Sequence, residues 1–351
     1  MSLATIKGPA IFLAQFLSEE PPFNSLESIT HWASGIGYTG VQIPVWDDRL
    51  IDVALAAESK TYCDELKGLC IQNGVEITEL ASHLVGQLVA THPAHDSLLN
   101  AFAPQQTHSD EAKRREWAIA RLGHIAAASK NMGLDRSVTF SGSFLWPFLY
   151  PHPAYPKDFI SDAFGELVKR WQPILDIYSE NGVYLCFEIH PMQDLHDGVT
   201  FERFLKLTDN HPACKIMFDP SHFVLQCIDY VSFIDHYHEH IKMFHVKDAE
   251  FQINGKTGVY GGYLDWVERA GRFRSLGDGT VDFKRVFSKL TQYGFDGWAV
   301  LEWECCLKNH LDGASEGSRF IRDHIIGAST KSFDDFVAAG NGKCNFDILG
   351  I

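Results

Sequence analysis

Carboxylates and histidines recur at the ends of apolar runs in the second half of the chain. The runs YLCFEI, KIMFD, IKMFHV and WAVLE contain or end with Glu188, Asp219, His245 and Glu302. Three carboxylates and one imidazole suit a divalent cation of intermediate hardness, and they favour Mn²⁺ or Mg²⁺ over a metal that prefers thiolates. If the four runs are neighbouring strands, these side chains form one metal site.

Each of these residues also has an ordinary explanation when it is taken alone. A single histidine such as His245 in an apolar strand is more often a hydrogen-bonded core residue than a ligand. Asp219 precedes Pro220, and an aspartate there commonly bonds the backbone of a turn. Glu188 and Glu302 are harder to explain, because a carboxylate at the end of a buried strand must be paired, protonated or metal-bound. The recurrence of four such residues favours the metal site.

The elements that must position these residues follow a repeating order. Short runs rich in β-branched or aromatic residues alternate with longer amphipathic segments, which is the pattern of βαβ units around a parallel sheet. We expect strands at residues 10–15, 40–44, 77–82, 137–140, 184–189, 215–219, 241–246 and 298–302. We expect helices at about 25–36, 58–74, 111–132, 162–182, 200–210, 229–239, 282–292 and 312–329, with Asp162 and Thr200 as helix starts.

Strict alternation of eight strands with eight helices favours a closed (β/α)8 TIM barrel over an open, doubly wound sheet. No GxGxxG motif follows the first strand, which weakens a dinucleotide-binding alternative. We therefore predict an α/β fold with a single barrel domain over residues 1–330 and a C-terminal extension over 331–351 that packs on the barrel or on a partner. The carboxyl ends of barrel strands face a common mouth, so the four residues are expected to converge there.

Extended loops are expected after strands three and four, at residues 85–110 and 142–158. The second carries several aromatic residues among prolines, too apolar for a loop that is merely solvated. It can be a lid with aromatic walls for a sugar-like ring, or it can pack on a neighbouring subunit. Trp46 and Trp146 are the rings that we expect to stack on a sugar.

Other candidate substrate-binding residues lie beside the four proposed ligands. His190 follows strand five and His222 lies three residues after Asp219, where each can be a further ligand or a donor that orients the ligands. Lys247 and Asp248 directly follow strand seven. These positions place polar side chains around the expected metal.

Composition narrows the choice of partner and compartment. The chain has 351 residues, 45% hydrophobic and 21% charged, and a formal net charge of −15. This charge repels phosphate backbones and anionic membranes, so neither a nucleic acid nor a membrane is an expected partner. The eight cysteines show no CxxC pair, no stretch is long enough for a membrane span, and no targeting segment precedes the first strand. We expect a cytoplasmic protein with reduced thiols.

The succession CFEIHP, FDPSH, FHVKDAE, GRFRSLGDGTVDF and VLEWE resembles the xylose-isomerase-like barrel superfamily of sugar phosphate isomerases and epimerases, which is related to AP endonuclease family 2. The resemblance runs through all eight strands and is most specific over residues 184–304. It implies that Glu188, Asp219, His245 and Glu302 are the metal ligands. It also implies that His83, His222 and Arg274 hold substrate oxygens or a phosphate, and that LGDG (276–279) is the glycine turn before the last barrel helix.

The sequence departs from its relatives in informative places. The AP endonucleases have extra zinc ligands after strand four and before the glycine turn, where this chain has Ser141 and Gly271-Arg272-Phe273. Together with the charge of −15, this departure argues against DNA as a substrate. The 3-epimerases have an arginine six residues after the strand-seven histidine, where this chain has Phe251.

The ligand set and the resemblance lead to an expected activity. A metal chelated by the carbonyl and hydroxyl oxygens of a sugar acidifies the carbon-bound proton and stabilises the resulting enediolate. Glu188 and Glu302 then act as acid and base, giving epimerisation, isomerisation or loss of water. Our first expectation is a sugar isomerase or epimerase; the alternatives are a lyase acting on an inosose, keto-sugar or keto-glycoside, and a non-catalytic barrel in a hetero-complex.

The expected cofactor is one divalent ion, with Mn²⁺ as first choice and Mg²⁺, Co²⁺ or Zn²⁺ as alternatives. The expected partner is a small neutral sugar or polyol, because no phosphate-binding glycine loop is present. A homo-oligomer, either a dimer or a tetramer, is the expected assembly.

Overall fold

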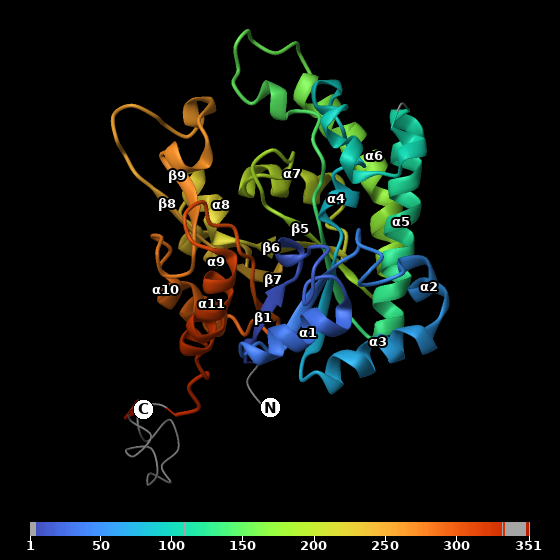
Figure 1. Cartoon of the computed structure of the whole chain (residues 1–351). Helices are drawn as coiled ribbons and strands as arrows, with labels where there is room; N and C mark the ends of the chain where they lie inside the picture. The colour runs from blue at the N-terminus through green and yellow to red at the C-terminus, as the bar shows by residue number, and fades with distance from the viewer. Residues whose placement is uncertain (1–4, 109, 332, 334–348, 351) are drawn as a thin grey trace.

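Eight parallel strands close into a barrel, as the alternation of the sequence predicts (Figure 1). The computed structural model describes residues 5–108, 110–331, 333 and 349–350. Around the barrel each strand pairs with its two neighbours in the order β1, β10, β7, β6, β5, β4, β3, β2. The strands are β1 (Lys7–Phe12), β2 (Gly40–Pro44), β3 (Glu76–Ala81), β4 (Arg136–Thr139), β5 (Tyr184–Glu188), β6 (Cys214–Phe218), β7 (Ile241–Val246) and β10 (Trp298–Leu301).

Helices surround the barrel and cover its outer face (Figure 1). The longer ones are α1 (Leu26–Gly35), α3 (Lys60–Gln72), α5 (Glu111–Met132), α6 (Phe159–Glu180), α7 (Gly198–Leu207), α9 (Tyr230–Tyr237), α10 (Phe283–Gln292) and α11 (His310–His324). Shorter helices are α2 (Val53–Glu58), α4 (His83–Gly86) and α8 (Pro220–Leu225). Single 3-10 turns occupy Ala14–Phe16, Pro93–His95, Leu98–Phe102, Gln105–Thr107, Trp146–Phe148, Gly261–Tyr263 and Trp266–Glu268.

Three helix starts differ from the sequence expectation. Helix α6 begins at Phe159 after Asp158, one turn before the expected start at Asp162. Helix α7 begins after Asp197, whose carboxylate accepts the Thr200 N–H, so Thr200 is the third helical residue of a capping box and not the cap. The helix expected at about 58–74 is α3, which begins at Lys60 because Ser59 is extended and its side chain caps the helix by accepting the Tyr62 N–H.

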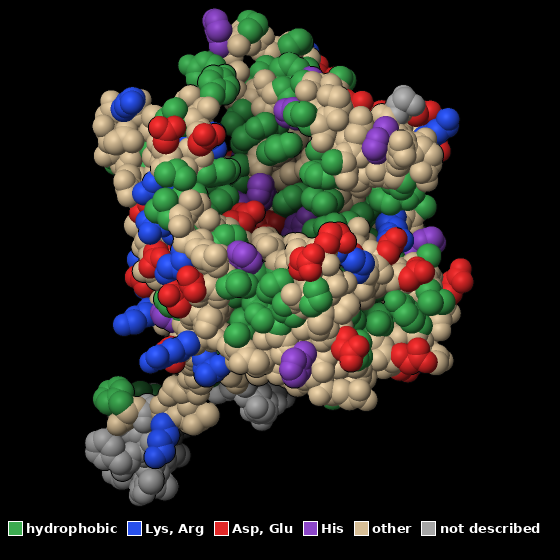
Figure 2. Space-filling view, viewed as in Figure 1, with side chains coloured by type: hydrophobic (Ala, Val, Ile, Leu, Met, Phe, Trp, Pro, Cys, Tyr) green, Lys and Arg blue, Asp and Glu red, His purple; other side chains and the backbone are tan. Residues whose placement is uncertain are grey.

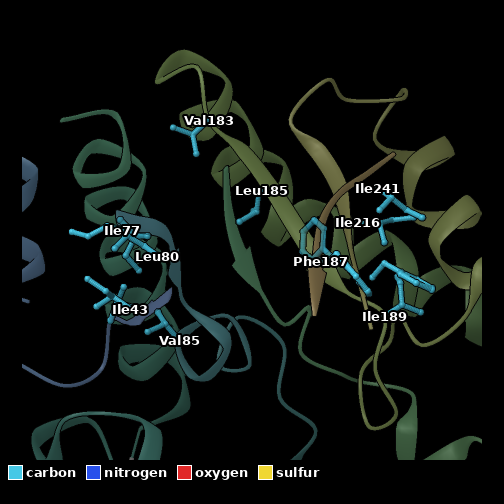
Figure 3. Close-up of a cluster of buried hydrophobic side chains, with 14 of the residues drawn as sticks. Ile43, Ile77, Leu80, Val85, Val183, Leu185, Phe187, Ile189, Ile216 and Ile241 are labelled. Atoms are coloured by element: carbon cyan, nitrogen blue, oxygen red, sulfur yellow. The ribbon is translucent and has the colours of Figure 1, made fainter. Parts of the chain in front are cut away.

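The two faces of each strand enter different apolar layers. Leu185 and Phe187 of β5 point outward into the large cluster between barrel and helices, part of which is drawn in Figure 3. Cys186 points into the barrel interior, where it packs with Met217, Met243 and their neighbours. Since side chains alternate along a strand, the residue two positions after each inward one also points inward, toward the barrel mouth.

The long loops rise from one end of the barrel (Figure 1). The loop between β3 and α5 and the loop between β4 and α6 are the two predicted extensions, and they meet at an isolated bridge between Thr91 and Ser143. A third feature was not predicted: β8 (Asp248–Phe251) and β9 (Gly271–Arg274) pair antiparallel as a hairpin after β7. These segments surround the mouth of the barrel.

Three further expectations concern regions outside the barrel itself. The predicted C-terminal extension, residues 331–351, falls for most of its length outside the described residues. Seven cysteines belong to the described part of the chain, and all seven are free thiols. Among the helices that the structure describes, none combines the length and apolar character required to cross a bilayer.

Candidate metal centre and barrel mouth

Glu188, Asp219, His245 and Glu302 converge at the barrel mouth, as the sequence predicts. Each side chain offers one ligand atom, and these four atoms all lie within 4.8 Å of one another. The first three residues are at most 1% exposed and Glu302 is 8% exposed. Asp219 Oδ2 is buried without a hydrogen bond of good geometry among the described residues, and the Lys247 ammonium lies 3.1 Å from it.

The pleat of the strands explains this convergence. The four residues lie two positions after Cys186, Met217, Met243 and Val300, which fill the barrel interior. The parallel register aligns Glu188 with Met217 and His245 with Val300. The layer above the apolar interior is therefore made of carboxylates and an imidazole, at the height where the strands end.

Lys247 lies between the carboxylates of this layer. Its Nζ is 2.7 Å from Glu302 Oε2, 3.1 Å from Asp219 Oδ2 and 3.1 Å from Glu304 Oε2. Burial by itself lowers the pKa of Lys247, but the surrounding carboxylates outweigh burial and raise it well above its ordinary value. The site therefore contains a buried ammonium group that balances part of the negative charge.

Glu188 and Glu302 have different electrostatic surroundings. Burial, followed by the charge of Glu302, raises the pKa of Glu188 well above its ordinary value. Burial also opposes ionisation of Glu302, but Lys247 and His245 outweigh it and hold the pKa of Glu302 well below the ordinary value. The first carboxylate therefore holds a proton more readily than the second.

Two histidines flank Glu188. His83 Nε2 lies 3.0 Å from Glu188 Oε2, though without the angle of a hydrogen bond, and His222 Nε2 lies 3.1 Å from Glu188 Oε1. Burial lowers the pKa of His83 to about 3 and that of His222 well below its ordinary value. His190 packs against His222 with the two rings tilted by 56° and their centroids 3.9 Å apart, and burial lowers the pKa of His190 to about 3. The three rings are therefore neutral at physiological pH.

A series of hydrogen bonds inside the barrel orients His245, and its members Gln42 and Glu79 were not predicted from the sequence. His245 Nδ1 faces Glu302 Oε2 at 3.1 Å, while its Nε2 lies 3.0 Å from Gln42 Oε1. The Gln42 amide nitrogen in turn lies 3.4 Å from Glu79 Oε2. Because an amide oxygen can only accept, His245 Nε2 carries a proton, and Nδ1 is the ring nitrogen that faces the ligand cluster. Burial opposes a charge on His245, but Glu302 outweighs burial and raises the pKa of His245, so without a metal ion Nδ1 donates to Glu302. The available signal was a polar residue inside each of the runs GVQIP and ITELAS.

Two expected substrate contacts have protein partners instead. The Asp248 carboxylate accepts backbone N–H groups from Ala249, Gly277, Gly279 and Val281, which fastens β8 to the glycine turn. A Cβ on Gly279 would lie 2.2 Å from Asp248 Oδ1, which explains the glycine. Arg274 pairs with Glu250 at 2.7 Å. Neither Asp248 nor Arg274 lines the mouth cavity, and the contacts of both are with the protein itself. Their roles as substrate contacts stay predictions.

The two tryptophans lie on different sides of the mouth. Trp46 packs edge to face against Phe12, with ring centroids 6.1 Å apart, and also contacts His83 at 6.4 Å. Trp146 belongs to the β4–α6 loop and packs against His196 at 5.6 Å. Only Trp146 lines the large cavity described next.

A cavity of about 1060 Å³ opens outward from the ligand cluster. Its floor includes His190, His222 and Glu304, and its walls come from the β4–α6 loop and the β8–β9 hairpin. Figure 2 shows this hollow, with hydrophobic side chains on its walls and acidic and histidine side chains deep inside. The arrangement can enclose a small organic molecule directly above a metal ion.

Comparison with known proteins identifies the family. Residues 31–324 match the family described as Xylose isomerase-like TIM barrel. The chain belongs to this family. The match confirms the resemblance in the strand-end motifs and includes all four candidate ligands.

Within the xylose isomerase-like TIM barrel family, similar proteins have different reactions in their names. An inosose dehydratase from Geobacillus thermodenitrificans is 24% identical over 167 residues, which is 47% of this chain and 56% of that protein. The chain thus spans about half the length of this curated relative.

Two solved structures share the fold at lower identity. The 3-keto-D-glucoside 4-epimerase of E. coli has a TM-score of 0.60 and 13% identity, covering 90% of this chain and 98% of its own. A family member from Mycobacterium smegmatis, solved in complex with magnesium, has a TM-score of 0.60 and 14% identity, covering 92% and 98%.

Proposed function

We propose that this protein is a metal-dependent dehydratase that removes water from an inosose or a related keto-sugar. The observation that carries the proposal is the inequality of its two catalytic carboxylates. Glu302 is paired with Lys247 at 2.7 Å and with His245 at 3.1 Å, whereas Glu188 faces only the imidazoles of His83 and His222. Elimination of water requires one base and one acid. In this proposal Glu188 is the base, and the Lys247 ammonium that pairs with Glu302 is the acid.

The donor set fits a hard or intermediate divalent cation held by Glu188, Asp219, His245 and Glu302. When bound, such an ion polarises a substrate carbonyl and acidifies the neighbouring C–H bond. The magnesium in the Mycobacterium smegmatis relative supports Mg²⁺, and Mn²⁺ suits the same ligands.

The residues of the chain divide the proton transfers between them. Glu188, one of the residues that would hold the metal, accepts the proton from the carbon next to the carbonyl in this proposal. Glu188 lacks the ion pair with Lys247 that stabilises the ionised form of Glu302, so Glu188 is the stronger base of the pair. As the C–H electrons form the new carbon–carbon double bond, the C–O bond at the next carbon breaks. Lys247 donates a proton to the departing hydroxyl, which leaves as water.

The surrounding residues bind and orient the substrate in this proposal. His83 and His222 are neutral and can each hydrogen-bond a sugar hydroxyl next to Glu188. Phe273 lines the cavity and provides an aromatic ring against which a sugar can pack, and Trp46 packs beside His83. The names of the curated relatives, inosose dehydratases, support an inosose as the first substrate to test.

Epimerisation is the second candidate, and it was our first expectation from the sequence. Two carboxylates from different strands, Glu188 on β5 and Glu302 after β10, can in principle exchange a proton across a substrate. The likeness to the E. coli 3-keto-D-glucoside 4-epimerase supports only the shared fold. The ion pairs of Glu302 make it the poorer base, which is why epimerisation comes second.

Incubation of the Mn²⁺-loaded protein with scyllo-inosose in D₂O tests the proposal. We expect metal-dependent loss of water, followed by NMR and by ultraviolet absorbance of the unsaturated product. The variants Glu188→Gln and Lys247→Met should each lower turnover by at least about 100-fold. Deuterium incorporation with inverted configuration and no loss of water would replace dehydration with epimerisation.

A further inference from the structure

The mouth cavity is larger than the proposed reaction requires. Its volume of about 1060 Å³ lies at the upper end of the roughly 300–1,000 Å³ that ligand sites of drug-sized molecules occupy. A free inosose or monosaccharide is much smaller than such a ligand. A sugar bound over the ligand cluster therefore leaves the outer part of the cavity unfilled.

Aromatic side chains from two loops enclose this outer part. The β4–α6 loop contributes Trp146 and Tyr150, and the β8–β9 hairpin contributes Tyr260 and Trp266. Tyr150 and Tyr260 meet edge to face with ring centroids 6.3 Å apart, so the two loops touch across the cavity. Walls of this kind bind flat rings through face and edge contacts.

A continuous series of contacts leads from the ligand cluster to the outer part. The ring of Phe273 lies 4.7 Å from Lys247 Nζ. The Trp266 ring lies 5.0 Å from that of Phe273, and the Arg269 guanidinium lies 4.7 Å over Trp266. One wall therefore begins at the proposed catalytic lysine and ends at an arginine.

Arg269 has no hydrogen bond or ion pair with any residue that the structure describes. Its Nε is buried without a hydrogen-bond partner, and its guanidinium makes a cation–π contact with the Trp266 ring. Gly261 makes room for it, because a Cβ there would lie 2.5 Å from Arg269 Nε. A planar guanidinium that lies in a cavity wall and is not paired with a carboxylate of the protein is suited to pair with an anionic group of a ligand.

The neighbouring arginines show that this lack of a partner is specific to Arg269. Arg272 and Arg274 belong to the same hairpin, and both bind Glu250 at 2.7 Å. The chain as a whole carries a net charge of −15, so carboxylates are plentiful on it. Arg269 nevertheless faces the cavity without one.

We propose that the outer part of the cavity is a subsite for a second ring that is aromatic and carries a carboxylate. The substrate would then be a keto-sugar or inosose joined to an aromatic acid, with the acid held by Arg269 and the ring held by Trp266 and Tyr260. This inference rests on the proposed function, since the sugar part must lie over the ligand cluster.

Binding of non-reacting glucosides to the Mn²⁺-loaded protein tests the subsite by isothermal titration calorimetry. The probes are methyl, 4-nitrophenyl and 4-carboxyphenyl β-D-glucopyranoside. We expect the 4-carboxyphenyl glucoside to bind about tenfold more tightly than the 4-nitrophenyl glucoside, because its carboxylate forms a charge-assisted hydrogen bond with Arg269. A glucuronosyl disaccharide that bound more tightly than the 4-carboxyphenyl glucoside would overturn the aromatic identity of the ring.

Variants separate the contribution of each wall. Arg269→Gln should remove the preference for the carboxylate, and Trp266→Leu should weaken both aryl glucosides and leave the methyl glucoside unchanged. Lys256→Gln is the matched control, because it removes an exposed positive charge from the same hairpin without touching the cavity. An unchanged preference in Arg269→Gln refutes the subsite. So does a change in oligomeric state by light scattering in either variant, because the loops would then be a subunit interface.

Turnover of scyllo-inosose is measured separately with the same samples. Turnover without any preference among the glucosides would leave the dehydratase proposal intact and refute the subsite. The expected preference without turnover of scyllo-inosose would retain the subsite and refute the proposed reaction.

Discussion

Replacement of Gln42 by methionine is expected to weaken metal binding although no ligand is removed. Gln42 Oε1 accepts a hydrogen bond from His245 Nε2 at 3.0 Å, and this contact keeps Nδ1 directed at the ligand cluster. In the variant, both tautomers and other ring orientations of His245 become accessible. Loss of such an orienting contact lowers metal affinity about 10 to 100-fold, or about 1.4–2.7 kcal/mol.

Calorimetric titration of the metal-free variant with Mn²⁺ measures this effect directly. The variant also loses the hydrogen bond between Gln42 and Glu79, so its unfolding free energy should fall by about 1–3 kcal/mol. Gln87→Met is the matched control, because Gln87 is a buried amide that bonds Gln193 and contacts no ligand. If Gln42→Met lost stability like the control yet bound Mn²⁺ with wild-type affinity, the role assigned to Gln42 would be wrong.

Three further predictions concern charge and loop anchoring. Lys247→Met removes the ammonium that Asp219 and Glu302 share, so the metal-free variant should be about 3–5 kcal/mol less stable than the wild type at pH 8. Saturating Mn²⁺ should restore much of this loss in a thermal melt. Equal stability of the two metal-free proteins would contradict the prediction. Asp194 accepts hydrogen bonds from the Ser143 side chain and from two backbone N–H groups of the β4–α6 loop. Asp194→Asn should therefore lower the unfolding free energy measured in urea by about 2–3 kcal/mol and speed proteolytic cleavage of this loop. An unchanged cleavage rate would show that the loop is held by other contacts. Burial raises the pKa of Glu79, so the folded chain keeps a proton that the unfolded chain releases, and this stabilising contribution is lost as the pH rises through the folded-state pKa. Glu79→Gln should therefore lose less stability than the wild type between pH 5 and pH 8 in urea unfolding, and identical pH profiles would exclude a protonated Glu79.

The barrel and its ligand layer could be predicted because both follow from local patterns. A buried parallel strand reads as a short apolar run, and a carboxylate at its end stands out against that run. Glu188 and Glu302 are examples, since each ends a run that otherwise fills the core. Closure of the barrel then places the ends of consecutive strands at one mouth without any further information.

The β8–β9 hairpin could not be predicted from such patterns. Its strands are four residues each, and Asp248 pairs with Arg274 far along the chain. Charged and uncharged residues alternate in each segment, but four residues are too few to distinguish a half-buried strand from a loop by this pattern. Their pairing depends on contacts distant in sequence, including the bonds from Asp248 to the glycine turn.

Gln42 and Glu79 were missed for a different reason. In an isolated strand, a polar residue at an alternate position normally indicates a solvent-facing side. Only the closed barrel turns that side inward, where Gln42 reaches His245 from the other side of the barrel. For Asp248 and Arg274, sequence position showed a place near the mouth but not their protein partners, the glycine turn and Glu250.

The anchoring of the hairpin by Asp248 bears on how new specificities can arise in this scaffold. The Asp248 carboxylate fixes the base of the hairpin next to β7 by accepting hydrogen bonds from four backbone N–H groups, whereas residues 252–270 connect the two hairpin strands beyond that base. Residues 252–270 can therefore be replaced by other sequences while the proposed metal ligands keep their positions. Grafting other sequences between Phe251 and Gly271 is a direct route to barrels that share one chemistry and accept different conjugates.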